Sequence, residues 1–519
     1  MCEELVLEVP SEFPEPKPVC LGLPEGALSE SEGPEACRWE ESESSELSVD
    51  LYEEFVRFME QMQATSPEIL RGVRASRALR SGPPRWIRGD LEKLHALSEA
   101  TDQLEEFWSH SWSTGALTKF TNVLLLNHGL PAFVVGTLSA ASVGSLCVLR
   151  LLPPWNLWGT VTGVLSYYLT LFLWSRRKQV FLDIACICQT DANLKAQGLL
   201  SIGAFLKNSR SLLVLWDVTW ASRLWCIFEM AAFLHSREPG AKKNLVVCPV
   251  FVAPALLIGH SGLSVLLIAY LLSQVPIFPW GGLVICLLTV PCLMLFAIAV
   301  VAHYRSIEQI QDQVRSFSID KSSCHCCSCE HVDPRTGETM ICDRRLIVRC
   351  ISLWFGSAAA FEEIVQTRLL TVLVYQLKMQ VFSYWRIVQA ASPALWMMID
   401  IWCADSMKGA ATEDLVEVAL AAVTLCFMFL PSVCLLLLNL AYKARHLRAP
   451  QTLIAGGLVA IGAGTFGLFL ASERMLVLIT GDQVNAGLIL CGVMGAMTLW
   501  LWRCVPMLGH DGTLSSEDF

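Results

Sequence analysis

The sequence is poor in charge: only 17% of its 519 residues are charged, whereas 54% are hydrophobic. Soluble domains average about 25% charged residues, so this composition argues against an ordinary soluble protein. The apolar residues gather in runs of about 20, the length that a helix needs to cross a bilayer. We therefore expect a mainly α-helical polytopic membrane protein with about eight transmembrane helices. The expected spans are residues 123–149, 155–174, 246–273, 280–302, 382–403, 414–441, 452–471 and 484–502.

The N-terminus lacks the basic region and apolar core of a signal peptide, so we expect the first span to direct insertion. Lys and Arg gather in alternate loops, at residues 71–88, 176–178 and 443–448, whereas the intervening loops are short and poor in cations. Cytosolic loops carry the excess of Lys and Arg. Eight spans with both termini in the cytosol therefore fit this bias, and six or seven spans do not. The sequence does not indicate which membrane is occupied.

The N-terminal residues 1–45 are rich in Glu, Ser and Pro, and we expect them to form a disordered acidic tail. This tail supplies much of the net charge of −10, which argues against a nucleic-acid partner. The bilayer is the one partner that the composition itself implies. The expected segments are a cytosolic helical and basic segment at 46–106, transmembrane hairpins at 123–174 and 246–302, a cytosolic Cys-rich and amphipathic segment at 303–378, four transmembrane helices within 382–502, and a cytosolic tail at 503–519.

A different pattern interrupts the spans. Residues 179–187 and 211–216 are apolar runs typical of buried strands, and 244–250 is a third short strand. Apolar residues at helical spacing connect these runs at 192–206 and 220–235. Alternating strands and helices predict a parallel sheet with helices on its faces.

The residues of this region resemble those of a TIR domain. The resemblance lies in the block Phe181-Leu-Asp-Ile-Ala-Cys-Ile-Cys-Gln-Thr-Asp191, in Ser209, in Leu212-Leu-Val-Leu-Trp216, in Arg223-Leu-Trp-Cys-Ile-Phe-Glu229, and in Phe107-Trp-Ser-His-Ser-Trp112, which is similar to the first strand of that family. Multipass proteins of unicellular algae of the dinoflagellate type carry a similar Leu-Asp-x-x-Cys-Ile-x-Gln block. The resemblance implies a small cytosolic α/β TIR-like module, split between residues 107–112 and 179–251. A hairpin of two spans stands where the family has its first helix, and two crossings return the chain to the same side.

The resemblance also implies a ligand site. Glu229 occupies the position of the glutamate with which catalytic TIR domains cleave the nicotinamide–ribose bond of NAD. In that reaction a carboxylate stabilises a ribose that resembles an oxocarbenium ion. The alternative is a structural role, in which Glu229 pairs with a nearby cation and its neighbours pack in the core. Candidate ligand-binding residues are Ser109, His110, Trp112, Asp183, Gln189, Asp191, Trp225 and Cys226.

The 21 cysteines do not suggest disulfides, because most lie in apolar spans or on the cytosolic side, which is reducing. The run Cys324-His-Cys-Cys-Ser-Cys-Glu-His331 contains two interleaved Cys-x-x-Cys pairs, which are typical of zinc ligands. Membrane-proximal cysteines are also sites of S-acylation. Zinc binding, acylation and unmodified thiols therefore all stay open. The candidate zinc ligands are Cys324, Cys327, Cys329, His331 and Cys342.

Three functions are consistent with the sequence. The leading one is signalling or scaffolding at the membrane, through cytosolic protein partners or self-association of the TIR-like module. The first alternative is a membrane-tethered NAD hydrolase that uses Glu229. The second is a transporter or channel, which needs ionisable or helix-breaking residues within its spans. His260, Pro291 and Pro431 are such residues, but no intramembrane acid–base pair stands out.

Overall fold

The computed structural model describes residues 46–111, 115–153, 155–217, 219–237, 244–273, 282–332, 337, 342–369 and 382–504. The expected acidic tail at 1–45, the candidate site residue Trp112 and residues 505–519 lie outside this part of the chain.

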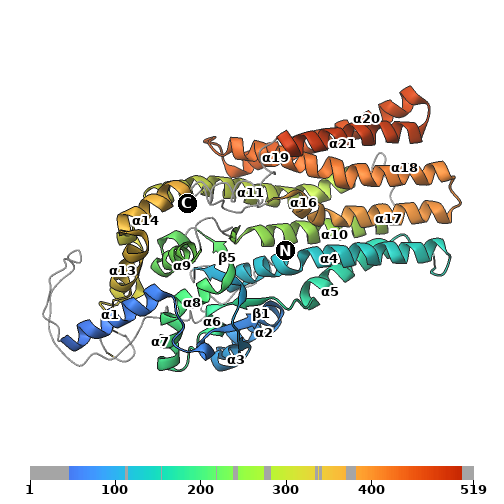
Figure 1. The fold of residues 1–519 in the computed structure, drawn as a ribbon. Helices are drawn as coiled ribbons and strands as arrows, with labels where there is room; N and C mark the ends of the chain where they lie inside the picture. The colour runs from blue at the N-terminus through green and yellow to red at the C-terminus, as the bar shows by residue number, and fades with distance from the viewer. Residues whose placement is uncertain are drawn as a thin grey trace, which may run out of the picture.

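Long apolar helices lie side by side and form a bundle (Figure 1). Six continuous apolar stretches of helix are long enough to cross a membrane. This agrees with the expected class of helical membrane protein. The six are α4 (Ala116–Val148), α10 (Val252–Ser273), α11 (Gly282–Arg315), the continuous stretch of α18 (Thr412–Val423), the π-helix η6 (Thr424–Phe429) and α19 (Leu430–Ala444), α20 (Gln451–Thr480) and α21 (Gln483–Cys504).

Two of the eight expected spans differ from this description. The helix α5 (Trp158–Leu173) has 16 residues, or about 24 Å of helix, which is short of the roughly 30 Å hydrocarbon core. The expected fifth span is bent, because α16 (Tyr384–Ala390) and α17 (Ser392–Met407) meet at 55°. Length and composition therefore give six spans, or seven when this bent pair is taken as one.

One six-stranded sheet stands beside the bundle, with the strand order β2-β1-β4-β3-β5-β6. The four strands from β4 to β6 are parallel, as expected, whereas β1 is antiparallel to both of its neighbours. The sheet is therefore mixed. Its two additional strands come from the segment that was expected to be only helical and basic. The strands are β1 (Arg71–Arg74), β2 (Ser98–Ala100), β3 (Leu104–His110), β4 (Gln179–Phe181), β5 (Ser209–Trp216) and β6 (Asn244–Pro249).

The strand expected over 179–187 is short in the structure. β4 ends at Phe181, and a helical turn, α6 (Asp183–Cys186), follows it. The Asp183 carboxylate accepts a hydrogen bond from the Ile184 N–H at 2.8 Å. Such local side-chain bonds draw the backbone away from the strand ladder, which accounts for the early end of β4.

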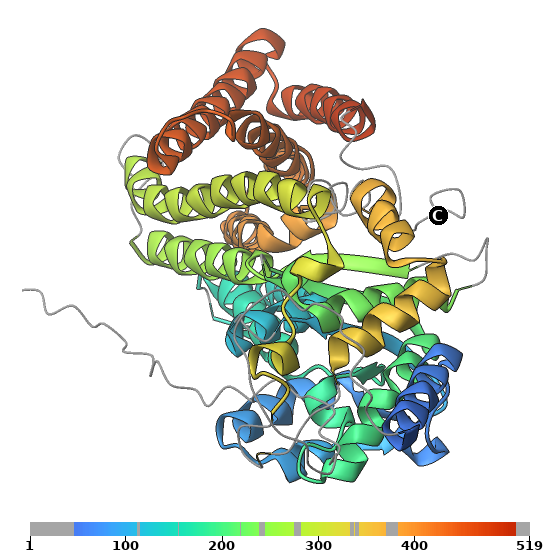
Figure 2. The same cartoon turned by 90° about the vertical axis from the view of Figure 1, so that its left-hand side faces the viewer.

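Helices cover the sheet in two successive layers. α8 (Ile202–Lys207) and α9 (Leu224–His235) contact the strands directly. α13 (Asp343–Phe355) packs outside α9, where Trp354 stacks on His235 with ring centroids 5.2 Å apart. α1 (Glu46–Gln61) lies against α13 and α8 (Figure 2). The remaining short elements are η1 (Pro67–Ile69), α2 (Ala75–Ile87), α3 (Leu91–His95), α7 (Ala192–Leu200), η2 (Trp220–Ser222), η4 (Ile319–Lys321), α12 (His325–Ser328), α14 (Ala358–Ile364) and η5 (Val365–Leu369).

The connection from β3 to β4 leaves the sheet and enters the bundle. A helix that joins two parallel strands ordinarily lies on the face of their sheet. Here α4 and α5 make the connection, and they run together away from the strands (Figure 1). Asn122 of α4 donates to the Val250 carbonyl just after β6, and its carbonyl oxygen accepts from the Ala253 N–H at 3.2 Å. These bonds fix the sheet end of α4 against the start of α10.

Candidate functional site

The sheet reverses its strand order at β3, which lies between β4 and β5. In doubly wound sheets, ligands bind at the carboxyl ends of the strands where this reversal occurs. Ser109 and His110 end β3 at this edge. Asp183 follows β4, and Cys226 and Glu229 come from α9. The structure therefore places five of the expected site residues around one edge of the sheet.

Glu229 is partly buried, and its Oε2 atom is enclosed with no hydrogen-bond partner among the described residues. Its carboxyl group is hydrogen-bonded to the Ser109 hydroxyl. The Ser109 oxygen also accepts from the indole N–H of Trp220 at 3.0 Å. Desolvation by burial raises the pKa of Glu229 to about 8, against a lowering by the bond to Ser109. At pH 7 the carboxyl group is therefore mostly protonated and neutral.

Burial also favours the neutral forms of two neighbours of Glu229, His110 and Cys226. The His110 Nε2 atom lies 3.9 Å from Asp183 Oδ1, yet burial lowers the pKa of His110. The Cys226 thiol donates to the His110 carbonyl at 3.6 Å, and burial raises the pKa of Cys226. Because a thiolate is the reactive form of cysteine, Cys226 is a structural thiol here. The edge thus holds two carboxyl groups, Glu229 and Asp183, with a neutral imidazole and a neutral thiol between them.

Three other expected ligand-binding residues take part in local structure. Asp191 caps α7 by accepting from the Leu194 N–H at 2.9 Å. The Gln189 side chain donates to the Ile187 carbonyl at 3.3 Å. Trp225 donates its indole N–H to Asp343 Oδ2 at 3.1 Å, and so it contacts the residue that follows Cys342 of the cysteine cluster.

Two contacts at this edge were not expected from the sequence. The Lys119 ammonium group, near the start of α4, donates to the Ser111 carbonyl at 2.6 Å. The Ser111 hydroxyl is hydrogen-bonded to the Thr219 hydroxyl at 2.6 Å. The one sequence signal for this arrangement is a lone lysine at the start of an apolar run. A basic residue there is equally typical of a membrane boundary.

A second group of side chains lies where α12 meets α13. Cys326, Cys327, His331 and Cys342 each bring one potential ligand atom within 4.8 Å of the others. Glu330 and His331 have φ angles of 52° and 60°, which are uncommon for residues other than glycine. This turn carries His331 back, so that its N–H donates to the Cys326 carbonyl at 2.8 Å. The His331 Nε2 atom is enclosed and has no hydrogen-bond partner among the described residues.

The sulfur separations in this Cys/His cluster fit a single tetrahedral metal ion. Cys327 Sγ lies 3.9 Å from Cys326 Sγ and 3.8 Å from Cys342 Sγ. Two thiolates bound to one tetrahedral zinc ion at about 2.3 Å lie about 3.8 Å apart. Cys324 Sγ is only 3.0 Å from Cys326 Sγ, which is too close for two ligands of the same ion.

The cluster overlaps in part with the expected zinc ligands. Cys327, His331 and Cys342 are brought together, and Cys326 joins them. Cys324 instead lies with Cys326 and Asp343, and Cys329 belongs to neither group. The hydrogen bond from Cys326 and the neighbouring imidazole of His331 lower the pKa of Cys342 well below its ordinary value. A thiolate at this position favours metal binding, because the thiolate is the ligand form of cysteine.

The Cys/His cluster is attached to the start of α9. The Ser323 N–H donates to the Ser222 carbonyl at 2.6 Å, and the Leu224 N–H donates to the Ser323 carbonyl at 3.1 Å. The bond from Trp225 to Asp343 adds a side-chain contact. The helix that carries Glu229 is thus held at its first turn by the loop that carries the cysteines.

No protein-family model, curated protein or solved structure matches this chain. Its function is therefore inferred from its residues and their geometry.

Proposed function

We propose that this chain is an integral membrane protein whose cytosolic TIR-like sheet module acts in signalling or scaffolding, through protein partners or self-association. The supporting observation is the junction between the sheet and the bundle. Lys119 of α4 donates to the Ser111 carbonyl at 2.6 Å, directly after β3. Asn122 of α4 accepts from the Ala253 N–H of α10 at 3.2 Å. A partner that displaces this edge of the sheet therefore displaces the ends of two membrane helices.

The state of Glu229 favours this function over NAD hydrolysis. Stabilisation of an oxocarbenium ion needs an ionised carboxylate, whereas burial raises the pKa of Glu229 to about 8. NAD hydrolysis through Glu229 is the alternative that an activity measurement distinguishes.

That measurement is nicotinamide release from NAD by the full-length protein in nanodiscs, with wild type beside Glu229→Gln. The variant keeps the shape and neutrality of the protonated carboxyl group. We expect no release from either protein, including wild type held at high density on liposomes. If wild type releases nicotinamide and Glu229→Gln does not, with unchanged thermal unfolding, the protein is an NAD hydrolase and the scaffold proposal is wrong.

Coupling between the sheet edge and the bundle is tested by hydrogen–deuterium exchange of the full-length protein in nanodiscs. We expect Lys119→Met to speed exchange in β3 and β5, because it removes the bond to Ser111. The matched control is Lys443→Met, which changes an exposed lysine at the end of α19. Exchange that is equally unchanged in both variants would show that the edge and the bundle are uncoupled.

Self-association is measured in a separate experiment, by single-molecule photobleaching of labelled protein in liposomes.

The Cys/His cluster is proposed to bind one structural zinc ion. Three cysteines and one histidine form a complete tetrahedral ligand set, which leaves no open position for a substrate. The sulfur separations of 3.8 and 3.9 Å support zinc over acylation, because acyl chains impose no such spacing. Zinc at this position stabilises the loop that holds the start of α9.

Metal analysis of the purified full-length protein tests this assignment. We expect about one zinc ion per chain, a large loss of zinc in Cys342→Ser, and full retention in Cys329→Ser, whose cysteine lies outside the group. A hydroxylamine-sensitive mass increase on these cysteines, in protein that contains no zinc, would instead establish acylation.

The transport alternative finds less support among the described residues of the bundle. His260 lies between the Tyr168 hydroxyl at 3.0 Å and the Ser392 hydroxyl at 3.2 Å. Its ring nitrogens are thus both engaged in bonds between helices. Ion flux through liposomes that contain the purified protein would restore transport as the leading function.

A further inference from the structure

Three arginines lie together where the sheet module meets the hairpin of α4 and α5. Arg80 belongs to α2, and Arg176 and Arg177 follow the end of α5. The Ser175 hydroxyl donates to the Ser76 hydroxyl of α2 at 3.5 Å, and this bond holds the two segments against each other. Arg80 comes about one helical turn after Ser76. We call these three arginines the junction patch.

The charges of the junction patch are not neutralised by the part of the chain that the structure describes. All three arginines are exposed, and none forms a hydrogen bond or an ion pair with a described residue. The acids of the neighbouring strands have other partners. Glu99 pairs with Arg77, and Glu105 accepts from a backbone N–H. Glu106 pairs with Lys178 at 2.9 Å. The patch therefore presents a net positive charge to its surroundings.

Both segments of the patch lie at one level of the hairpin. Arg80 and Arg176 each act electrostatically on His128 of α4, although they come from different segments of the chain. The His128 Nδ1 atom donates to the Leu171 carbonyl at 2.8 Å and so connects α4 to the last turn of α5. α2 also packs against α4. The positive charge of the patch is thus concentrated at the end of the hairpin that is nearer to the sheet.

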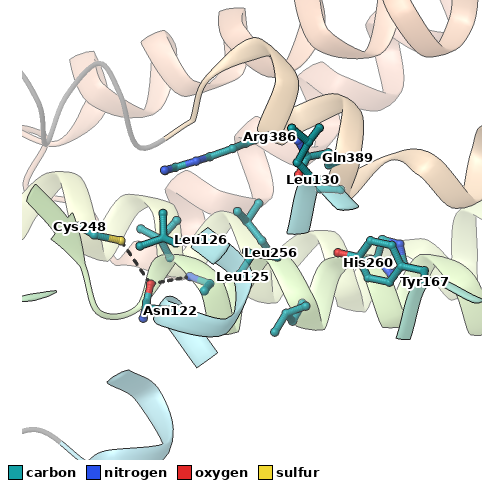
Figure 3. Close-up of a pocket in the computed structure, with 14 residues that line it drawn as sticks. Asn122, Leu125, Leu126, Leu130, Tyr167, Cys248, Leu256, His260, Arg386 and Gln389 are labelled. Carbon is teal, nitrogen blue, oxygen red and sulfur yellow. Dashed lines mark hydrogen bonds between the residues drawn. The ribbon is translucent and has the colours of Figure 1, made fainter. Parts of the chain in front are cut away.

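The lipid-facing surface of the hairpin begins at the same level. Asn122 accepts from the Cys248 thiol at 3.5 Å, which keeps the first turns of α4 beside the sheet (Figure 3). About two turns later, Leu130 has 57% of its surface exposed, on a helix long enough to span a membrane. At the end of α5, Leu173 is 61% exposed and Trp174 is 40% exposed. The junction patch therefore adjoins an apolar surface that faces lipid chains.

The spacing along the chain places the arginines at the depth of lipid headgroups. Tryptophan is enriched at the membrane–water interface, and Trp174 is the last residue before the chain leaves the hairpin. An extended chain advances at most about 3.6 Å per residue, so Arg176 lies at most about 7 Å beyond Trp174. The headgroup region of one leaflet is roughly 5–7 Å thick. Arg176 and Arg177 therefore reach the phosphate groups of the leaflet beside the sheet module.

We propose that the junction patch binds the headgroup of an anionic phospholipid in the leaflet beside the sheet module. Guanidinium groups bind phosphate oxygens with two parallel hydrogen bonds, and the acyl chains lie along the apolar surface next to the patch. Anionic lipids are concentrated in the cytosolic leaflet, so the proposal rests on the cytosolic placement of the module but not on its role in signalling. Because one headgroup contacts both α2 and the end of α5, it fixes the module against the bilayer.

Native mass spectrometry of the full-length protein in detergent tests the proposal, with phosphatidylserine and phosphatidylcholine of matched acyl chains as probes. We expect wild type to prefer phosphatidylserine. Arg80→Gln and Arg176→Gln should each reduce this preference about fivefold, the usual contribution of one basic residue at an anionic surface, and the variant with all three arginines changed to Gln should abolish it. The matched control is Arg57→Gln, which removes the charge of an exposed arginine on α1, away from the bundle (Figure 1). It should bind like wild type.

Four outcomes would overturn the proposal. Equal binding of the two lipids by wild type would show that the protein does not select the charge. An unchanged preference in the triple variant would place the anionic lipid elsewhere, and an equal loss in Arg57→Gln would assign the preference to net charge alone. Displacement of phosphatidylserine by glycerophosphoserine at equal concentration would identify a soluble anion as the ligand.

Two further measurements separate the site from other effects. Thermal unfolding of each variant reports the fold, and Arg80→Lys, which keeps the charge, should keep most of the preference. Lipid selectivity in detergent does not depend on NAD turnover or on self-association. This proposal and the proposed function can therefore fail separately.

Discussion

The bundle and the sheet module each enclose a carboxyl group, but they satisfy it differently. In the bundle, Asp400 of α17 accepts from the Gly159 N–H at 2.6 Å, the Thr160 N–H at 2.7 Å and the Thr160 hydroxyl at 2.6 Å. In the module, Glu229 is bonded to Ser109, and its Oε2 has no partner among the described residues. Asp400 therefore fixes one helix against another. At the edge where the strand order reverses, the Oε2 atom of Glu229 thus makes no hydrogen bond within the described residues, and a ligand or partner can supply the missing bond.

The largest expected effect on stability is at Asp400. We expect Asp400→Ala to lower the free energy of unfolding by about 4 kcal/mol, because it leaves donors at the first turn of α5 buried and unsatisfied. The matched control is Asp405→Ala on the same helix, whose ion pair with Lys408 is partly exposed and is worth less than about 1 kcal/mol. Unfolding in detergent measures both. Equal losses in the two variants would show that Asp400 is no more structural than a surface acid.

The second prediction concerns how the stability of the folded protein depends on pH through Glu229. Between the ordinary pKa of 4.5 and about 8, folded Glu229 binds more protons than the unfolded chain does, so stability falls as pH rises. Wild type should lose about 2 kcal/mol relative to Glu229→Gln between pH 6 and pH 7.5, at about 1.4 kcal/mol per pH unit. Thermal unfolding midpoints of both proteins at the two pH values measure this difference. Midpoints that change in parallel would mean that Glu229 is ionised in the folded protein.

The smallest expected effect concerns the support of α9. Trp225→Phe removes one hydrogen bond to Asp343 and keeps an aromatic ring, so we expect a loss of about 1 kcal/mol. Zinc content should stay at the wild-type value, because Trp225 is not a ligand. The unfolding midpoint and metal analysis of the same sample report both quantities. A loss of zinc would show that the Cys/His cluster depends on α9 as much as it supports that helix.

The sequence predicts features that follow from hydrophobic pattern. The apolar runs predict the helical bundle, and the strands predicted at 211–216 and 244–250 correspond to β5 and β6 within two residues at each end. The antiparallel strands β1 and β2 are not predicted from hydrophobic pattern, because a strand of three or four residues is too short to show a periodic signal. From the sequence alone, Arg71–Arg74 is predicted to belong to a basic loop. Its pairing with β4 identifies it as a strand.

The candidate site is predictable only in part for a similar reason. The edge residues Ser109, His110 and Asp183 are candidates because of the resemblance to a TIR domain, and hydrophobic pattern alone does not single them out. The role of Trp225 depends on Asp343, which is distant in the chain. The expected zinc ligands include Cys324 and omit Cys326, although both cysteines belong to Cys-x-x-Cys pairs, so this spacing does not choose between them. The left-handed turn at Glu330 and His331 changes that choice, and spacing alone does not reveal it.

The insertion of α4 and α5 between β3 and β4 makes the assembly of the sheet depend on the folding of the helical bundle. During synthesis β3 emerges before the hairpin, and β4 emerges after it. These strands are neighbours, so they pair only when α4 and α5 have packed against each other and brought the chain back to the sheet. A chain whose hairpin fails to return keeps β3 and β1 without the strand that lies between them. Unpaired strand edges promote aggregation, so a chain in which α4 and α5 have not yet packed together exposes an edge that the folded protein covers.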